Sequence, residues 1–465
     1  MAKSVDMYLP YPFFLGYAAS FLRASSGHDV IFLDACAEAF NELEFKERVR
    51  HLSPDLLVIE APTVSFSAEM RMLREIREEN RDMKIAITGL HVSGLGDAVL
   101  KQEEAIDYGL VGEFELTLQE LVERELVANE VQGVIWRQNG AVVSNPARQV
   151  NKDISSYPYP ERQAHVLSRY YDFVLAGKPT VQMLTSRSCP VGCHFCYTTV
   201  FYENPMLRGR TPEDIANEID FVKSKFGAKQ IYFDDDTLSI NPKHMQSFCH
   251  YLIDNKIDMP WAAMADITIS RENIGLAKKA GCIGLKFGVE SADPIVLKDM
   301  HKGIVTADKT LAYRRLLREM GIWAHATFTF GHPRDTLESM ESTLKFSLKL
   351  DPDSVQYTIV TPLPGTPFYY ECKEKGWLST EDYSRFDGNN FGVVDTVNFT
   401  HKDVERIHDF AFKEWSRNIR TPRHLGHFIP LSLRTKGVFP TAQAITRRAI
   451  SDRKGYTRGR GDTPT

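Results

Sequence analysis

The sequence predicts an α/β protein with two parallel-sheet domains and a helical C-terminal extension. Predicted strands and helices alternate through residues 1–130, and they alternate again through residues 181–380 as six strand–helix units. From Tyr383 onward the pattern becomes polar, aromatic and then helical. Alternation of strands with helices is typical of parallel sheets that are covered by helices. We therefore expect a doubly wound N-terminal sheet, a partial TIM-type (βα)6 barrel that is open on one side, and a C-terminal extension.

In the N-terminal domain, residues 1–130, short apolar runs predict strands and amphipathic spacing predicts helices. The helices are expected at residues 13–23, 68–79 and 117–126. Ligands of doubly wound sheets bind at the carboxyl ends of the strands, where Asp34, Gly89 and Gly112 are expected. The expected strands are residues 5–9, 28–33, 55–59, 84–89 and 108–111.

Residues 131–180 are expected to connect the two domains. Residues 132–143 predict a small hairpin with Asn139-Gly140 as its turn. The proline-rich stretch that follows, residues 157–160, suits a segment that crosses between domains.

The second domain, residues 181–380, is expected to place its functional groups at the carboxyl ends of the barrel strands, as βα barrels do. Its strands are predicted at residues 181–186, 230–234, 261–265, 284–289, 323–330 and 355–360. Its helices are predicted at residues 212–226, 242–255, 271–280, 307–320 and 337–350.

Three cysteines follow the first of these strands with the spacing Cys-x3-Cys-x2-Cys: Cys189, Cys193 and Cys196. Thiolates this close together suit three corners of a cubane [4Fe-4S] cluster. The fourth iron then has no protein ligand, and an open coordination position is typical of a catalytic site. Structural zinc prefers four ligands, and His194 lies between two ligating positions. A disulfide would leave one of the three cysteines over. The spacing therefore favours a cluster and an enzyme rather than an electron carrier.

The cysteine motif, with Phe195 before its last cysteine, resembles the signature of the radical S-adenosylmethionine (SAM) enzymes. The resemblance continues in the family's order along the chain. It is closest to the branch that carries a cobalamin-binding-type domain in front of the barrel, which includes the anaerobic magnesium-protoporphyrin IX monomethyl ester cyclases and hopanoid-pathway proteins. The further matching segments are residues 208–219, 231–238, 288–291, 330–336 and 361–366.

This resemblance implies that the three cysteines hold a [4Fe-4S] cluster and that SAM chelates the open iron. One electron from the cluster then cleaves SAM to methionine and a 5′-deoxyadenosyl radical. Phe195 and Tyr197 are expected to wall the sulfonium cation. Within the run Asp234–Asp236, Asp235 is the expected acceptor for the SAM ammonium, although an N-cap role also explains an aspartate there.

Further residues are assigned to SAM by the same resemblance. Glu290, which ends an apolar strand, is expected near the ribose or methionine end, and Gly331 near the adenine. Arg208 and Arg210 are explained equally well by binding of the SAM carboxylate and by salt bridges at a helix entry. The sequence by itself identifies no catalytic side chain.

The N-terminal domain has some features of a cobalamin-binding domain and lacks another. The turns at residues 88–91 and 112–115 lie where cobalamin-binding domains have theirs. The Asp-x-His-x-x-Gly motif that supplies a histidine to cobalt is absent, and the loop at residues 10–12 is too short to hold it. His91 is interpreted as a loop residue. Cobalamin binding therefore stays open.

Composition agrees with a soluble, cytoplasmic, multi-domain enzyme, and the resemblance implies a small-molecule substrate. The chain has 465 residues, of which 25% are charged, and a net charge of −5, which gives no reason to expect nucleic acid. No apolar run reaches the length of a membrane span, and no signal-peptide core begins the chain. A flavodoxin- or ferredoxin-type electron donor is implied by the resemblance. Residues 381–446 are expected to cover the substrate and to form a helix at 402–419, and residues 447–465 to be a solvated basic tail.

The leading hypothesis is a radical SAM enzyme that abstracts hydrogen from an unactivated carbon of a small metabolite, lipid, tetrapyrrole or antibiotic precursor. If cobalamin binds, C-methylation is the expected outcome. Without cobalamin, cyclisation, rearrangement or radical dehydration of a diol is expected. A non-catalytic cobalamin or cluster sensor is a remote alternative, because a sensor has no reason to keep the full series of barrel motifs.

Overall fold

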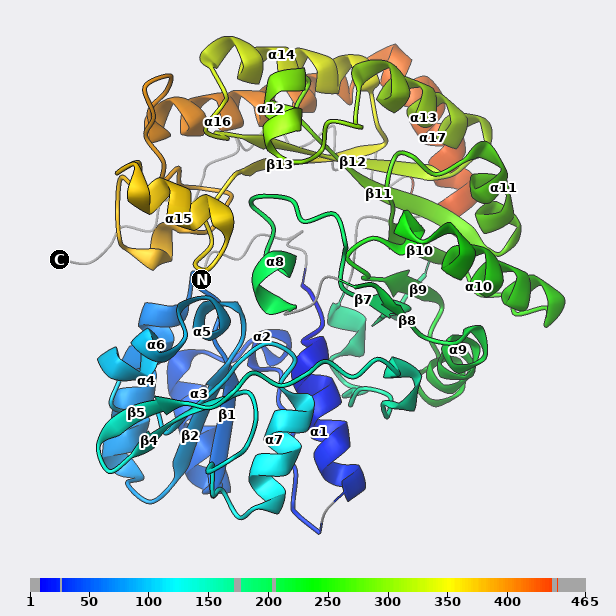
Figure 1. Cartoon of the computed structure of the whole chain (residues 1–465). Coiled ribbons are helices and arrows are strands. Elements are labelled where there is room, and N and C mark those ends of the chain that lie inside the picture. Colours follow the sequence, from blue (N-terminus) through cyan, green and yellow to red (C-terminus); the bar gives the residue numbers. More distant parts are fainter. Residues whose placement is uncertain (1–8, 26, 171–176, 203–205, 437–440, 442–465) are drawn as a thin grey trace.

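The computed structural model of the chain describes residues 9–25, 27–170, 177–202, 206–436 and 441 (Figure 1). The strand predicted at residues 5–9 lies outside the described residues except for Leu9, and the predicted basic tail lies outside them entirely. Two sheets form the body of the molecule, one in each predicted domain. This confirms the predicted fold class.

The first sheet has five strands in the order of the sequence. Its first three strands are parallel: β1 (Leu56–Glu60), β2 (Lys84–Thr88) and β3 (Tyr108–Leu110). The predicted hairpin follows as β4 (Val134–Gln138) and β5 (Ala141–Ser144), and β4 pairs antiparallel with β3. Asn139 and Gly140 have φ values of 51° and 85°, the left-handed backbone that a two-residue hairpin turn requires.

One predicted strand is wrong. Residues 28–33 belong to no strand or helix. Side chains bond the backbone of this segment where a neighbouring strand would: Arg23 donates to the carbonyl of Val30 at 2.7 Å, and Gln163 to that of Phe32 at 2.9 Å. The apolar pattern of the segment has another cause, because Phe32 packs into the core of the barrel domain.

Helices cover both faces of the first sheet, as a doubly wound fold requires. Ile85 and Ile87 of β2 point to one face and pack beneath α4 and α6, while Ala86 points to the other face, beneath α1 and α7. The helices of this domain are α1 (Phe13–Ser25), α2 (Ala35–Glu38), α3 (Glu42–Leu52), α4 (Phe66–Glu79), α5 (Leu90–Leu95), α6 (Asp97–Gln102) and α7 (Glu115–Glu123).

The second sheet has six parallel strands in the order β6-β9-β10-β11-β12-β13, so it is a partial (βα)6 barrel (Figure 1). Its strands are β6 (Thr180–Met183), β9 (Gln230–Phe233), β10 (Trp261–Met264), β11 (Cys282–Glu290), β12 (Trp323–Phe330) and β13 (Ser354–Ile359). Its helices are α9 (Pro212–Phe226), α10 (Pro242–Asp254), α11 (Arg271–Lys279), α12 (Pro294–Asp299), α13 (Ala307–Glu319) and α14 (Leu337–Leu350).

The starts of these helices are encoded locally. Thr211, Asn241 and Ser270 each accept a hydrogen bond from a backbone N–H in the first turn of the helix that follows. Such caps satisfy amide groups that have no partner inside the helix. Asn241 and Thr211 are each followed by a proline, which fits the first helical position.

Short elements surround the cysteine loop. β7 (Ser186–Arg187) and β8 (Arg208–Gly209) pair as a small ribbon, and α8 (Thr198–Phe201) follows the last cysteine. Elsewhere in the described residues, 3-10 turns lie at Ile154–Ser156, Leu167–Arg169, Leu238–Ile240 and Tyr383–Arg385.

The C-terminal extension contains α15 (Pro367–Glu374), α16 (His401–Asn418) and α17 (Pro422–Lys436). The helix α16 is the one predicted at residues 402–419, and it packs on β13 and α14. Of the residues that the structure describes, none belong to a helix long and apolar enough to span a membrane.

Candidate functional site

The three cysteines lie together on the loop that follows β7, at the carboxyl end of β6. None forms a disulfide, and their thiols are close enough to affect one another's pKa. Burial raises the pKa of Cys193 to about 12, while the nearby Lys302 ammonium opposes that rise. An uncharged buried thiol needs a cation to become a thiolate, and an iron–sulfur cluster supplies one. The donor set therefore fits a cluster with three protein ligands.

Polar contacts fix the side chains of the cysteine loop. The Thr198 hydroxyl donates to the Cys196 sulfur at 3.2 Å. His194 turns away from the thiols, with its Nε2 3.1 Å from a Glu371 carboxylate oxygen on α15. The structure therefore does not offer His194 as the fourth ligand of a zinc site.

Asp235 does not point toward the cysteines. Its carboxylate accepts hydrogen bonds from the Thr185 backbone N–H at 2.6 Å, from the Thr185 hydroxyl, and from the Ser186 hydroxyl at 2.8 Å. Both carboxylate oxygens therefore bond the end of β9 to the start of the cysteine loop. This role of Asp235 differs from the expected one, which was to bind the SAM ammonium. Asp236 is the aspartate beside the loop, because the Tyr197 hydroxyl donates to it.

Glu290 ends β11 beside the cysteines. It is buried, its φ is 62°, and a bulge in the pairing of β11 with β12 precedes it. A glutamate with positive φ is strained, and such strain clusters at functional sites. The Glu290 carboxylate lies 2.6 Å from the Lys302 ammonium, and Lys302 lowers the pKa of both Cys193 and Cys196. A side chain at Gly288 would overlap Glu290, so glycine is required for this pair.

Lys302 was not among the residues expected from the sequence. It belongs to no regular element, and it lies 12 residues beyond its partner Glu290. The next residue back, His301, contacts the carbonyl of Gly192 at 2.9 Å, so this segment lies directly against the cysteine loop. Only the folded chain brings the two segments together.

The aromatic residues expected around SAM differ in their surroundings. Phe195 is half-buried and packs against the barrel core. Tyr197 is exposed, and its hydroxyl donates a hydrogen bond to Asp236. Gly331 has φ 89°, and a Cβ there would lie 2.9 Å from Val404 of α16. The absence of a side chain at Gly331 therefore allows α16 to pack close to the backbone at this position.

A buried arginine joins the two domains next to the cysteines. Arg187, two residues before Cys189, is 2% exposed. Its guanidinium lies 2.7 Å from a carboxylate oxygen of Glu113 and 2.7 Å from one of Glu115, at the carboxyl end of the first sheet. It is also surrounded by aromatic rings of α1 and the connecting segment, namely Phe14, Tyr17 and Tyr157.

Two other arginines, which the sequence left between SAM binding and helix-entry salt bridges, are both in buried ion pairs. Arg208 pairs with Glu113, and so adds to the link between the domains. Arg210 pairs with Glu218 and with Asp214, which lies 2.6 Å away in the first turn of α9. The geometry supports the structural explanation for both.

The carboxyl end of the first sheet is lined with acidic groups. Burial raises the pKa of Glu60, at the end of β1, to about 7, and the charges of Glu115 and Asp34 add to the rise. Burial likewise raises the pKa of Glu69 to about 7, and Glu69 has one buried oxygen without a hydrogen-bond partner. This edge therefore offers acceptors to a ligand that carries N–H donors.

His91 lies at the same edge and is also buried. Its ring stacks on Phe66 and contacts the edge of Tyr383, and its Nδ1 is 3.4 Å from the Thr63 hydroxyl. Burial lowers the pKa of His91 to about 4. The packing of the ring is that of a structural histidine.

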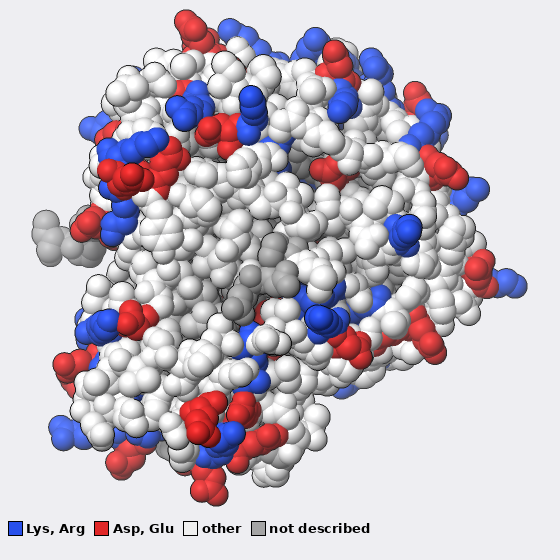
Figure 2. All heavy atoms as spheres, viewed as in Figure 1, with Lys and Arg blue, Asp and Glu red and all other residues white. Residues whose placement is uncertain are grey.

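The two domains meet closely at this edge. A Cβ at Gly94 of α5 would overlap the backbone of Pro364, in the loop that follows β13. The helix α5 also packs against α8. On the face viewed in Figure 2, charged side chains gather around the outline of both domains, while the described residues near its centre are mostly uncharged.

Comparisons with known proteins agree with both domains. Residues 183–347 match the family model of the radical SAM superfamily, and residues 8–122 match that of the B12 binding domain. The uncharacterized methyltransferase PH0819 of Pyrococcus horikoshii is 27% identical over 94% of this chain and 92% of its own length. The anaerobic magnesium-protoporphyrin IX monomethyl ester cyclase of Rubrivivax gelatinosus is 27% identical over 81% of this chain and 68% of its own.

Solved structures show the same fold. The cobalamin-dependent SAM radical enzyme OxsB has a TM-score of 0.68 at 16% identity, covering 96% of this chain and 73% of its own. The radical SAM methyltransferase TsrM from Kitasatospora setae has a TM-score of 0.66 at 20% identity, covering 78% of this chain and 75% of its own. This chain therefore shares its fold with both of these enzymes.

Replacing Arg187 tests the link between the domains. In Arg187→Met, Glu113 and Glu115 lose a buried cation, so we expect the free energy of unfolding to fall by about 3–5 kcal/mol. The matched control Arg124→Met removes a partly exposed helical pair with Glu120 and should cost less than about 1 kcal/mol. Urea unfolding measures both, and equal costs for the two variants would contradict the buried link.

Glu69 predicts a pH dependence of stability. Because its folded pKa is raised to about 7, above the unfolded value of about 4.3, its contribution is fully present below pH 4.3 and is lost as the pH rises through 7. Glu69→Gln should therefore lose less stability between pH 5 and pH 8 than the wild type, by on the order of 1 kcal/mol. The exposed Glu78→Gln on the same helix should follow the wild type. Identical pH profiles of all three proteins would refute the prediction.

Proposed function

We propose, since this chain belongs to the radical SAM superfamily and carries an N-terminal B12 binding domain, that it methylates an unactivated carbon of a small molecule. The observation that carries this proposal is the buried contact of Arg187 with Glu113 and Glu115. It holds the carboxyl end of the first sheet, where such domains bind ligands, against the loop of the three cysteines. A methyl carrier on the first domain would then adjoin the site of SAM cleavage.

Residues of the barrel account for binding of the cluster and SAM. Cys189, Cys193 and Cys196 would hold a [4Fe-4S] cluster, which supplies the electron that cleaves SAM reductively. Lys302 would bind the SAM carboxylate, because its ammonium is held beside the cysteines by Glu290. Asp236 would face the SAM ammonium in place of Asp235, whose oxygens are occupied.

Residues of the first domain suit cobalamin, whose corrin ring is bordered by amide groups. Glu60 and Glu69 would accept hydrogen bonds from these amides, and the unpartnered oxygen of Glu69 supports this role. When bound, cobalamin carries the methyl group that is transferred. His91 is packed between Phe66 and Tyr383, which supports binding without a histidine on cobalt.

A second candidate function is a cyclisation or rearrangement that needs no methyl carrier. It is favoured by the absence of the Asp-x-His-x-x-Gly motif. The same cluster and SAM residues would serve either reaction. The products of SAM distinguish the two.

The electron source and the compartment follow from the cluster chemistry. An iron–sulfur cluster with an open iron needs a reducing interior, and all seven cysteines are free. We therefore favour the cytoplasm, with a ferredoxin or flavodoxin as the electron donor.

Anaerobic product analysis tests the proposed function. The protein, reconstituted with iron and sulfide, would be given dithionite and SAM with or without methylcobalamin. Methylation predicts both 5′-deoxyadenosine and S-adenosylhomocysteine, the second only with cobalamin. Deoxyadenosine alone would favour the second candidate. Cys193→Ala should abolish both products, and Cys372→Ala, a buried thiol of α15, is the control for loss of a cysteine.

Replacing Lys302 tests its role toward SAM. Lys302→Met removes a charge-assisted hydrogen bond of about 1.5–3 kcal/mol, so the KM for SAM should rise at least about tenfold. Iron content per chain should stay unchanged. The exposed Lys298→Met, on the adjoining helix α12, should keep the wild-type KM. A normal KM for SAM in Lys302→Met would exclude the assigned role.

A further inference from the structure

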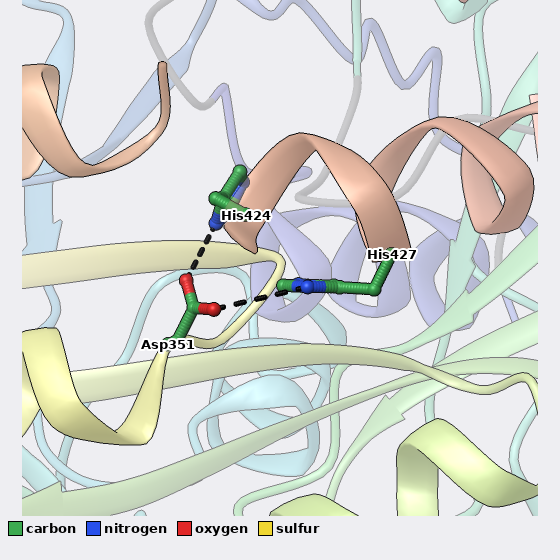
Figure 3. Close-up of side chains that lie close together, drawn as sticks. All are labelled: Asp351, His424 and His427. Carbon is green, nitrogen blue, oxygen red and sulfur yellow. Dashed lines mark hydrogen bonds and ion pairs between the residues drawn. The ribbon is translucent and has the colours of Figure 1, made fainter. Parts of the chain in front are cut away.

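The end of helix α14 and the helix α17 bring an aspartate and two histidines together (Figure 3). Asp351 follows the last turn of α14, and its φ of 51° is the left-handed conformation in which helices commonly end. His424 and His427 are three residues apart in the first half of α17, so both face the same side of that helix. One nitrogen or oxygen from each of the three side chains lies within 4.8 Å of the others.

The Asp351 carboxylate is fully buried, and one of its oxygens has no hydrogen bond. The other oxygen, Oδ1, accepts a hydrogen bond from the Asn418 amide at 3.1 Å and lies 2.7 Å from His424 Nδ1. Oδ2, which has none, lies 3.7 Å from His427 Nδ1 (Figure 3). A buried carboxylate oxygen without a hydrogen bond is costly, and a bound cation offsets that cost.

The charges around Asp351 can accommodate a divalent cation. Asp353 is buried as well, and it pairs at 3.1 Å with the buried Arg314. Arg318 and Arg423 lie 3.7 Å and 3.5 Å from Asp351 Oδ2, but their side chains are 42% and 62% exposed. Because both arginines reach the carboxylate from solvent, they can turn away when a metal ion takes their place. Two buried carboxylates then face one buried guanidinium among the described side chains, and this excess of negative charge suits a dication.

Asp353 is also placed to orient His427. The Nε2 of His427 lies 3.4 Å from Asp353 Oδ1. A histidine that binds a metal through one ring nitrogen usually donates the N–H of the other to a carboxylate or carbonyl, which fixes the ring. His427 Nδ1 lies 3.1 Å from the carbonyl oxygen of Arg423. With the ring proton on Nε2 instead of Nδ1, the Nδ1 atom would be able to bind a metal while Nε2 donates to Asp353.

The donor atoms select the class of metal. Two imidazole nitrogens and one carboxylate oxygen suit zinc, which is usually bound by four ligands in a tetrahedron. Magnesium and calcium prefer oxygen ligands alone. Three protein ligands leave one position of the tetrahedron, which a water molecule can take.

We propose that Asp351, His424 and His427 bind a zinc ion that fastens α17 to the barrel. Trp323 of β12 lies on the inner face of the barrel sheet, and its ring packs on Phe428 of α17 with 5.3 Å between the ring centroids. The zinc ion would hold α17 next to this contact. Asp351 comes just before β13, so the site lies at the amino ends of the barrel strands, opposite the cysteine loop. The inference therefore stands apart from the proposed function.

Zinc binding by the full chain with its reconstituted cluster tests the inference. The protein would be equilibrated with zinc chloride, desalted and analysed for zinc and iron by mass spectrometry, and the Kd would be measured in competition with a chromophoric chelator. The wild type should keep one zinc ion per chain with its iron unchanged, and magnesium chloride should leave no bound metal. In His424→Gln and in His427→Gln, the Kd for zinc should rise at least about tenfold. His401→Gln, which removes a histidine paired with Asp395 at 2.8 Å, should bind zinc as the wild type does.

Cys193→Ala controls for zinc bound by thiolates, and it should keep its zinc. Loss of zinc in Cys193→Ala together with retention in both histidine variants would place the metal at the cysteine loop and overturn the inference. A wild type that keeps no zinc, or an equal Kd in the wild type and in His427→Gln, would overturn it as well. His427 is partly exposed, so His427→Gln decides the test if the buried His424→Gln fails to fold. Failure of the proposed function would appear separately, as absence of 5′-deoxyadenosine in the product assay.

Discussion

The buried guanidinium of Arg187 is the contact on which the site depends. It lies between Glu113 and Glu115 of the first domain, two residues before the first cysteine of the second. Charges removed from water need a partner, so loss of any one of these three side chains would leave a buried carboxylate or cation unpaired. The position of the cysteine loop is therefore coupled to the carboxyl end of the first sheet.

Around the cysteines, charge is arranged in pairs that compensate one another. Lys302 lies beside thiols that become thiolates only with a cation nearby, and Glu290 holds that ammonium in place. Gly288 leaves room for the pair, and the positive φ of Glu290 turns its side chain toward it. The strained backbone of Glu290 and its ion pair with Lys302 thus lie together beside the position expected for SAM.

The inner face of the barrel has helix α17 packed at one end and the cysteine loop at the other. Phe428 and Leu431 of α17 cover the amino ends of the strands, and the ion pairs of Asp351 hold that helix. The cysteine loop lies at the opposite, carboxyl ends.

By itself the sequence determined the fold class, because strand–helix alternation and local caps such as Thr211 and Asn241 are encoded within a few residues. It also determined the cysteine triad, since the ligands of one loop are adjacent in the chain. The apolar pattern of residues 28–33 predicted a strand wrongly, because Phe32 is apolar to pack into the core of the barrel domain and not to pair in a sheet. Sequence motifs did not predict the contacts of Asp235 or of Lys302. Only the tertiary structure decided which aspartate faces the loop and which lysine reaches it, because hydrogen bonds and ion pairs between distant segments fix where a side chain points.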